Sequence, residues 1–201
     1  MKRNLMGQLP ILLLASAIGL GACASAPTTS PSGAVAQHAS KAAISRDEVI
    51  AAQNAWGAAL VSISTTYDNN GLEAATKTAE AVLDSAYGYG YGWGPVLFKP
   101  TLTTAPQTFR TTRDGALAYF VGHNSKFPGD TGFALKHWRS VKIENAAIFI
   151  DDDVAMSMGN VHITDRDGNV TTVDKTWGYK RDKDGALRIV LHHSSLPYKP
   201  G

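Results

Sequence analysis

The sequence has a single cysteine, no marked excess of either charge and no long hydrophobic run. With only Cys23, the chain can form no internal disulfide framework and no zinc site built from several cysteines. The 19 basic and 17 acidic residues nearly cancel, and without residues 1–22 there are 17 of each. A neutral chain offers no electrostatic attraction to nucleic acid or to an anionic membrane surface. The length of 201 residues, 44% of them hydrophobic, is typical of one compact domain.

The N-terminus has the order of a secretory signal. Lys2 and Arg3 precede an apolar segment at 11–18, which is too short to span a bilayer readily, and small residues follow it. The segment 20–23 (LGAC) resembles a bacterial lipobox, in which the cysteine is diacylated and becomes the new N-terminus. Acyl chains on Cys23 would anchor the protein without a transmembrane helix. The alternative is an ordinary signal peptide with a chance cysteine.

These features divide the chain into three parts. We expect a lipoprotein signal peptide over 1–22 and, over 23–44, a lipidated cysteine followed by a flexible tether rich in Ala, Ser, Thr and Pro. The folded domain is expected over 45–201. Ala24, rather than Asp, follows the cysteine, as in the outer-membrane sorting pattern of Gram-negative lipoproteins. We therefore expect a lipid-anchored protein at the outer membrane that faces the periplasm.

The folded part is expected to begin with two helices over about 46–86. The segment 45–48 (SRDE) is a capping box, in which Ser and Glu side chains satisfy free amides of the first turn. Two apolar stripes follow at steps of three or four residues, separated by the helix-ending segment 68–71 (DNNG). Further on, Thr112 is expected to cap a short helix over 114–120.

The second half of the chain is rich in strands. Four are predicted at 138–150, 154–164, 170–181 and 186–194, separated by Asp- and Gly-rich reversals, and a short one at 96–98. Helices followed by an antiparallel meander indicate an α+β fold, in which N-terminal helices pack on a curved antiparallel sheet. The NTF2-like cone has this order and encloses a pocket, although a fold alone does not give a function.

Several standard catalytic motifs are absent from the sequence. None of the six histidines forms an H-x-H or H-E-x-x-H pair, so no intrinsic metal site is predicted. There is no G-x-S-x-G, and the segment 165–168 (DRDG) lacks the spacing of a calcium loop. The segment 87–94 (YGYGYGWG) is not a phosphate loop; it is either an extended segment lined by aromatic side chains or a packed glycine-rich loop.

The C-terminal segment 191–197 (LHHSSLP) carries the remaining chemistry. Strand alternation places His192 and Ser194 on one face and His193 and Ser195 on the other. If the chain closes a cone, one pair faces the pocket and offers a titratable proton acceptor beside a hydroxyl. The alternative is a polar strand end near the surface.

The same segment resembles a known family. Residues 192–197 (HHSSLP) are similar to the C-terminal motif of the iota-class carbonic anhydrases, which are NTF2-like. The segments 96–101 (VLFKPT) and 115–122 (GALAYFVG) resemble stretches of bacterial and cyanobacterial members, and the resemblance spans about 45–199. It implies a pocket containing Thr101, Tyr119 and Ser194, with His192 beside the last.

The resemblance implies the reversible hydration of carbon dioxide to bicarbonate and a proton, with carbon dioxide and bicarbonate as the partners. A metal-free site must hold water and substrate within reacting distance and stabilise the incipient bicarbonate with hydrogen-bond donors. We expect Thr101, Tyr119 and Ser194 to supply those donors and a neutral His192 to take the proton. No cofactor is expected, although some family members are associated with manganese or zinc.

The remaining expectations concern the pocket wall, an alternative function and assembly. Tyr91, Trp93 and Phe98 are expected to form the wall, and His193 and Ser195 are further candidates for substrate binding. A non-catalytic NTF2-like lipoprotein that binds a small ligand would use the same pocket and is the alternative function. We also expect a homodimer, because NTF2-like sheets often pair back to back.

Overall fold

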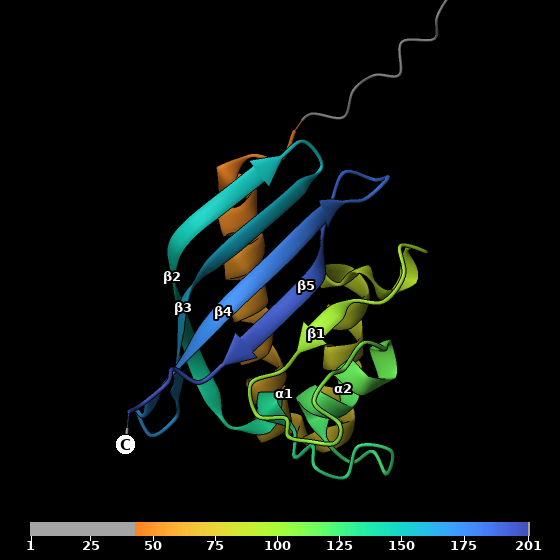
Figure 1. Ribbon diagram of the computed structural model, residues 1–201. Coiled ribbons are helices and arrows are strands. Elements are labelled where there is room, and N and C mark those ends of the chain that lie inside the picture. Colours follow the sequence, from red (N-terminus) through yellow and green to blue (C-terminus); the bar gives the residue numbers. More distant parts are fainter. Residues whose placement is uncertain (1–42, 201) are drawn as a thin grey trace, which may run out of the picture. The chain divides into compact units, whose positions relative to one another are not determined.

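The computed structural model describes residues 43–200, so the expected signal peptide, Cys23 and most of the tether lie outside the described residues. Helices and strands follow one another in the predicted α+β order (Figure 1). The helices are α1 (Arg46–Ala86) and α2 (Arg113–Val121), and the strands are β1 (Leu97–Lys99), β2 (Trp138–Asp151), β3 (Val154–Asp165), β4 (Val170–Arg181) and β5 (Leu187–Ser195). No helix in this part of the chain has the length and hydropathy needed to cross a membrane.

Helix α1 begins at the predicted capping box and is interrupted at the predicted break. The Ser45 hydroxyl accepts from the Glu48 amide at 3.2 Å, and the Ser45 amide donates to the Glu48 carboxylate at 2.8 Å. Gly71 has a φ of 78°, a left-handed conformation that glycine adopts without a steric cost. The break separates α1 into the two helical halves that the apolar stripes predicted.

The sheet has the strand order β1-β5-β4-β3-β2. Strands β2 to β5 form the predicted antiparallel meander, whereas β1 pairs with β5 in parallel. This parallel pairing sets Phe98 beside His192 and Lys99 beside His193. Because β1 and β5 lie far apart in the sequence, their pairing joins the middle of the chain to its C-terminal segment.

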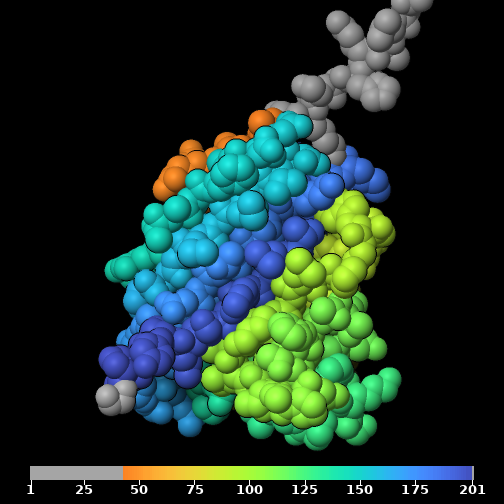
Figure 2. All heavy atoms as spheres, viewed as in Figure 1, coloured from red at the N-terminus to blue at the C-terminus, as the bar shows by residue number. Residues whose placement is uncertain are grey.

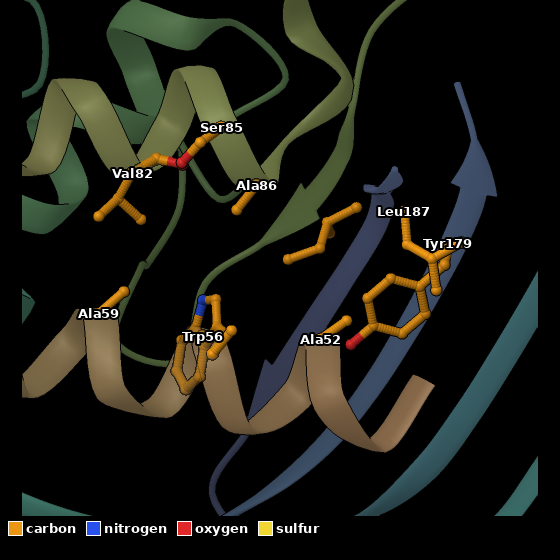
Figure 3. Close-up of a pocket in the computed structure, with 10 residues that line it drawn as sticks. Ala52, Trp56, Ala59, Val82, Ser85, Ala86, Tyr179 and Leu187 are labelled. Carbon is orange, nitrogen blue, oxygen red and sulfur yellow. The ribbon is translucent and has the colours of Figure 1, made fainter. Parts of the chain in front are cut away.

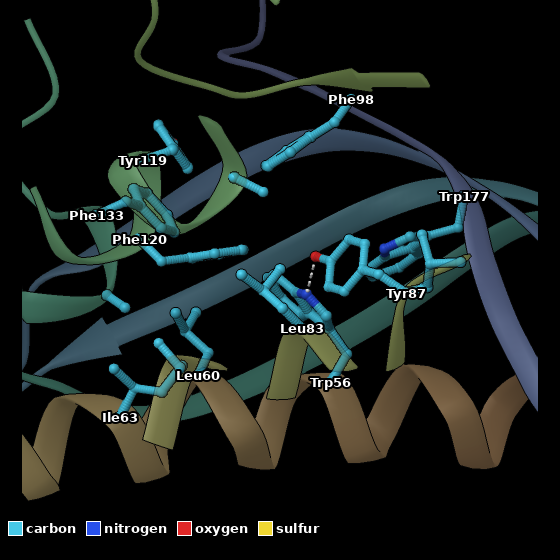
Figure 4. Packing of buried hydrophobic residues seen from close by; sticks show 14 of the residues in the cluster. Trp56, Leu60, Ile63, Leu83, Tyr87, Phe98, Tyr119, Phe120, Phe133 and Trp177 are labelled. Atoms are coloured by element: carbon cyan, nitrogen blue, oxygen red, sulfur yellow. Dashed lines mark hydrogen bonds between the residues drawn. The ribbon is translucent and has the colours of Figure 1, made fainter. Parts of the chain in front are cut away.

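The hydrophobic core fills the space between α1, α2 and the inner face of the sheet. Figure 4 shows Trp56, Leu60 and Ile63 of α1 projecting into this space, which α2 closes with further aromatic side chains. Strand β4 contributes Val173 and Trp177 from its inner face, and both are buried. One side of the sheet is therefore covered by helices, and the buried side chains of the sheet lie within this covered layer.

Candidate active site

Two of the predicted hydroxyl groups are in direct contact. The Thr101 hydroxyl donates to the Ser194 hydroxyl, with 2.6 Å between the two oxygen atoms. The parallel pairing of β1 and β5 brings them together, because Thr101 lies two residues after the end of β1 and Ser194 lies near the end of β5. Lys99 Nζ also donates to the Ser194 carbonyl at 3.0 Å. Since Thr101 supplies the proton of this contact, the proton of the Ser194 hydroxyl is left for another acceptor.

Tyr119 of α2 brings a third hydroxyl to the same place. Its ring meets Phe98 edge-on at 5.7 Å and stacks on Phe133 at 5.4 Å between ring centres. Burial raises the pKa of the Tyr119 hydroxyl, while the Thr101 side chain and the Leu102 backbone partly oppose that rise. No group among the described residues completes a hydrogen bond of ordinary geometry with this hydroxyl. A buried donor in this state is costly unless a ligand or water satisfies it.

A small cavity reaches Tyr119. Its volume of about 30 Å³ exceeds the roughly 10–15 Å³ needed for one water molecule. It is lined by Leu102, Tyr119, Gly129, Asp130, Thr131, Phe133 and Lys136. The lining combines apolar side chains with Tyr119 and the charged residues Asp130 and Lys136, and the volume suits a compact molecule such as water or carbon dioxide.

His192 is held by a second group of polar side chains. Its Nδ1 atom is 2.9 Å from the Tyr87 hydroxyl, which in turn accepts from Trp56 Nε1 at 3.0 Å (Figure 4). The imidazole also stacks on Phe98, with 4.4 Å between ring centres. His192 and Ser194 are both buried, so this pair faces the interior of the predicted cone. The surface alternative for this strand end is wrong.

Lys175 of β4 is part of the same group, and the sequence patterns did not single it out. It lies opposite Ser194 in the β4–β5 register, and its Nζ is 2.9 Å from His192 Nε2. Lys175 is 3% exposed, and its Nζ lies 4.0 Å from the Trp56 ring centre. The signal was present in the sequence, because strict alternation with Val173 and Trp177 places Lys175 on the inner face.

The surroundings change the acid–base properties of both groups. Burial lowers the pKa of Lys175 to about 7. Burial, with smaller contributions from the charges of Lys175 and His193, lowers the pKa of His192 well below its usual value. This corrects the expectation that His192 would take a proton with an ordinary pKa, because its buried ring lies beside a basic amine. Near neutral pH, Lys175 is the group of this pair that titrates.

The other predicted substrate contacts are placed differently. Phe98 is buried and contacts His192 and Tyr119, as expected of a wall residue. Tyr91 and Trp93 instead stack on each other, with cations above each ring, Arg188 over Tyr91 and Lys180 over Trp93.

The glycines explain this difference. Gly88–Gly90 forms a 3₁₀ turn, and Gly92 and Gly94 have φ values of 70° and 96°. The segment therefore bends rather than running as the extended wall that alternation suggested. Tyr87 and Gly88 are buried, whereas Gly90 and residues 92–94 are exposed, so only the start of the loop is packed. His193 and Ser195 alternate with the buried pair and lie on the other face of β5.

A second cavity, of about 190 Å³, lies between the two halves of α1 and the β4–β5 hairpin (Figure 3). It is lined by Ala52, Ala55, Trp56, Ala59, Val82, Ser85, Ala86, Tyr179, Leu187 and Ile189. The Trp56 indole N–H is directed to Tyr87, and the lining holds no acid or base other than the Tyr179 hydroxyl. This cavity lacks the groups that proton transfer requires.

Metal-binding side chains do not gather at the site. Within residues 43–200, no group of three or more His, Cys, Asp or Glu side chains is arranged to hold a metal ion. The polar groups around Thr101 and His192 are hydroxyls, an imidazole and an amine. Their chemistry is hydrogen bonding and proton transfer.

The chain is similar to a described protein family and to one of its members. A family model described as metal-independent carbonic anhydrase matches residues 47–196. The chain belongs to the metal-independent carbonic anhydrase family. A metal-independent carbonic anhydrase from Nostoc sp. is 62% identical over 157 residues, which cover 78% of this chain and 76% of that relative.

Two solved structures are similar to this member of the metal-independent carbonic anhydrase family. The crystal structure of a cyanobacterial iota-carbonic anhydrase complexed with bicarbonate is 62% identical, with a TM-score of 0.77, and the match covers 79% of this chain and 95% of that one. A putative calcium/calmodulin-dependent protein kinase II association domain from Xanthomonas campestris, 24% identical with a TM-score of 0.50 over 76% of this chain and 88% of that one, shares the fold alone. The predicted family resemblance and the NTF2-like fold are confirmed.

Proposed function

We propose that the chain is a carbonic anhydrase that hydrates carbon dioxide reversibly, giving bicarbonate and a proton, without a metal cofactor. Family membership supports this activity, and the description of the family and of its Nostoc relative supports the absence of a metal. The observation that carries the proposal is the contact of Thr101 with Ser194 next to the free hydroxyl of Tyr119. A similar chain has been crystallised with bicarbonate, the product of this reaction.

The hydroxyl groups act on the developing bicarbonate. Ser194 and Tyr119 each retain an O–H proton that no described residue accepts, so two donors are available where negative charge forms. Such donors are pre-positioned, since Ser194 is fixed by Thr101 and Tyr119 by the rings of Phe98 and Phe133. Fixed donors in a buried site stabilise a transition state more than the same groups would in water. The basic pair of His192 and Lys175 receives the proton.

A stopped-flow measurement of carbon dioxide hydration by the full chain tests the activity. We expect turnover far above the uncatalysed rate, with saturation by carbon dioxide. The non-catalytic alternative, a lipoprotein that only binds a small ligand in this pocket, predicts bicarbonate binding with no acceleration of hydration. A wild-type chain that binds bicarbonate but leaves the hydration rate unchanged would establish that alternative.

We propose further that the protein is anchored to the outer membrane by lipid on Cys23 and faces the periplasm. The support is the order of charged, apolar and small residues over 1–22, followed by LGAC and Ala24. Residues 23–44 would then serve as the tether to the domain over 45–201.

Replacing the lipidated thiol gives a direct test of the anchor. The C23S variant, expressed in a Gram-negative host with radiolabelled palmitate, is expected to carry no label and to leave the membrane fraction, because no other cysteine exists in the chain. The wild-type chain is the labelled control. Label that persists in C23S would contradict the assignment.

We propose that two copies pair through the outer face of the sheet. The strand registers align Phe149, Met156, Gly178, Leu191 and Leu97 into one row that crosses all five strands. Phe149, Met156 and Leu97 are exposed in this row. The space-filling view shows β2 to β5 across this face, with the beginning of α1 at one margin and the segments around β1 and α2 beside the strands (Figure 2). A continuous apolar row on an exposed sheet face, with Met158 exposed beside it, favours a second copy of the same surface as its occupant.

A charge placed in this row is expected to separate the copies. Light scattering of wild-type protein should give the mass of a dimer, and M156E the mass of a monomer, because the carboxylate would be buried unpaired in the interface. V170E, which changes an exposed residue outside the row, is the matched control and should remain dimeric. A monomeric wild type, or a dimeric M156E, would contradict this interface.

A further inference from the structure

We propose that Lys175 holds the proton released during hydration and that His192 links it to the site without becoming a cation itself. This rests on the proposed function and assigns a residue to its proton-transfer step.

Lys175 lies on the strand next to His192 and Ser194. Its register partner on β5 is Ser194, and cross-strand partners on one face have Cβ atoms about 5 Å apart. Its side chain reaches diagonally to His192, and its Nζ lies 2.9 Å from His192 Nε2. On the other side, Lys175 pairs with Gly159 of β3, which has no side chain to interact with it.

The amine has no acidic partner among the described residues. α1 presents the Trp56 ring to Nζ, β4 presents Trp177 of its own strand, and β5 presents His192. The neighbouring carboxylate, Asp174, belongs to the opposite face of β4 and accepts from Asn160 at 2.8 Å. Within residues 43–200 no carboxylate forms an ion pair with Lys175, and burial alone lowers its pKa.

A buried amine of this kind is costly if its only role is to fill space. A charged ammonium without a counter-ion loses its hydration, and an apolar side chain of similar length would pack in the same space without that cost. A pKa of about 7 makes the neutral amine available as a base at physiological pH. His192 is the weaker base of the two, because burial and the adjacent amine lower its pKa further.

The hydrogen bonds of His192 can adapt to either state of Lys175. When Lys175 is neutral, Tyr87 donates to Nδ1 and Nε2–H donates to the lone pair of Nζ. When Lys175 is an ammonium, Nζ donates to Nε2, and Nδ1–H donates to the Tyr87 oxygen, which also accepts from Trp56 and turns its own O–H away from Nδ1. One added proton thus changes the tautomer of His192 while its ring stays neutral.

The proposed step transfers one proton from water to Lys175. The water oxygen forms a bond to the carbon of carbon dioxide, one water O–H bond breaks, and the released proton ends on Nζ of Lys175. The neutral amine becomes an ammonium, and bulk water or buffer takes the proton before the next turnover. In the dehydration direction, the ammonium of Lys175 supplies the proton.

The pH dependence follows from this assignment. Hydration requires the neutral amine, so its kcat/KM should fall as the pH decreases below the pKa of Lys175, about 7. Dehydration requires the ammonium and should show the opposite trend. The other titratable side chain that contacts Nζ within the described part of the chain is His192, whose pKa is lowered by burial and by the adjacent amine.

Two variants on the same strand separate this role from a structural one. In the full chain, K175M is expected to lower kcat/KM for hydration by about 100-fold or more, the range for a lost general base, and to abolish the titration near neutral pH. Added imidazole buffer should restore part of the rate. K180M, which changes a side chain that is 39% exposed on β4, should keep the wild-type rate and pH profile. A K175M variant with the wild-type rate and profile would overturn the assignment and leave the proposed function standing, whereas an inactive wild type would remove the function itself.

The tautomer of His192 can be measured by NMR in the wild-type chain, so this second test does not depend on whether a Lys175 variant folds. With ¹⁵N-labelled histidine, and the His192 signals identified by their loss in H192Q, lowering the pH through neutrality should convert His192 from the Nε2–H to the Nδ1–H tautomer. Its ring should remain neutral. Protonation of both ring nitrogens in this range, or a tautomer that does not change, would overturn the assignment.

Discussion

The Y119F and S194A variants are each expected to lose about 10- to 1,000-fold of kcat/KM for carbon dioxide hydration while remaining folded. Each change removes one hydroxyl and little volume. The Tyr119 hydroxyl completes no hydrogen bond of ordinary geometry with a described residue, so little native hydrogen bonding is lost with it. Ser194 accepts from Thr101, and its removal also releases Thr101.

The measurement compares stopped-flow hydration rates with thermal unfolding of the same samples. The double variant should be more impaired than either single one, but by less than the product of the single losses if both hydroxyls act on the same oxyanion. Y198F removes the hydroxyl of an exposed tyrosine and is the matched control. Full activity in Y119F/S194A would reject the three-hydroxyl site.

The R110A variant is expected to lose about 3–5 kcal/mol of unfolding free energy. Arg110 and Asp130 form a bidentate ion pair, with distances of 2.7 and 2.8 Å, and both side chains are 3% exposed. The guanidinium also donates to the Gln107 carbonyl at 2.6 Å and lies over the Phe127 ring. Truncating Arg110 leaves a buried carboxylate without its partner, which is the costly outcome for a pair of this kind.

Urea unfolding measures this loss, and two variants show its origin. R110A/D130A should recover part of the stability, because it removes the unpaired carboxylate as well. R113A breaks an ion pair to Asp84 whose side chains are 34% and 61% exposed, and it should change stability by about 1 kcal/mol or less. An R110A variant as stable as R113A would contradict the account. Asp130 also lines the cavity at Tyr119, so R110A should reduce hydration as well.

Local signals in the sequence predicted most of the fold. The capping box at Ser45, the break at Gly71 and the Thr112 cap are short-range features, and the structure contains all three. The parallel pairing of β1 with β5 was not predictable in this way, because it joins segments far apart in the chain. That pairing is what brings Thr101 to Ser194, so the family resemblance, rather than local pattern, indicated the site.

Alternation of residues along a strand did not predict two features of the structure, the contact of Lys175 and the positions of Tyr91 and Trp93. Alternation indicates that Lys175 faces inward, but its contact with His192 depends on the β4–β5 register, which is shifted by an irregularity between Gly178 and Tyr179. For Tyr91 and Trp93, alternation with glycine indicated an extended wall, but glycine allows left-handed bends that no side-chain pattern reveals.

The central claim is that hydroxyls, an imidazole and an amine hydrate carbon dioxide without a metal ion. Its most direct test is the hydration rate of the full wild-type chain after exhaustive chelation, with elemental analysis of the same sample. The account predicts an unchanged kcat/KM in protein that contains no stoichiometric metal. Loss of hydration on chelation, restored by one added metal ion, would contradict it.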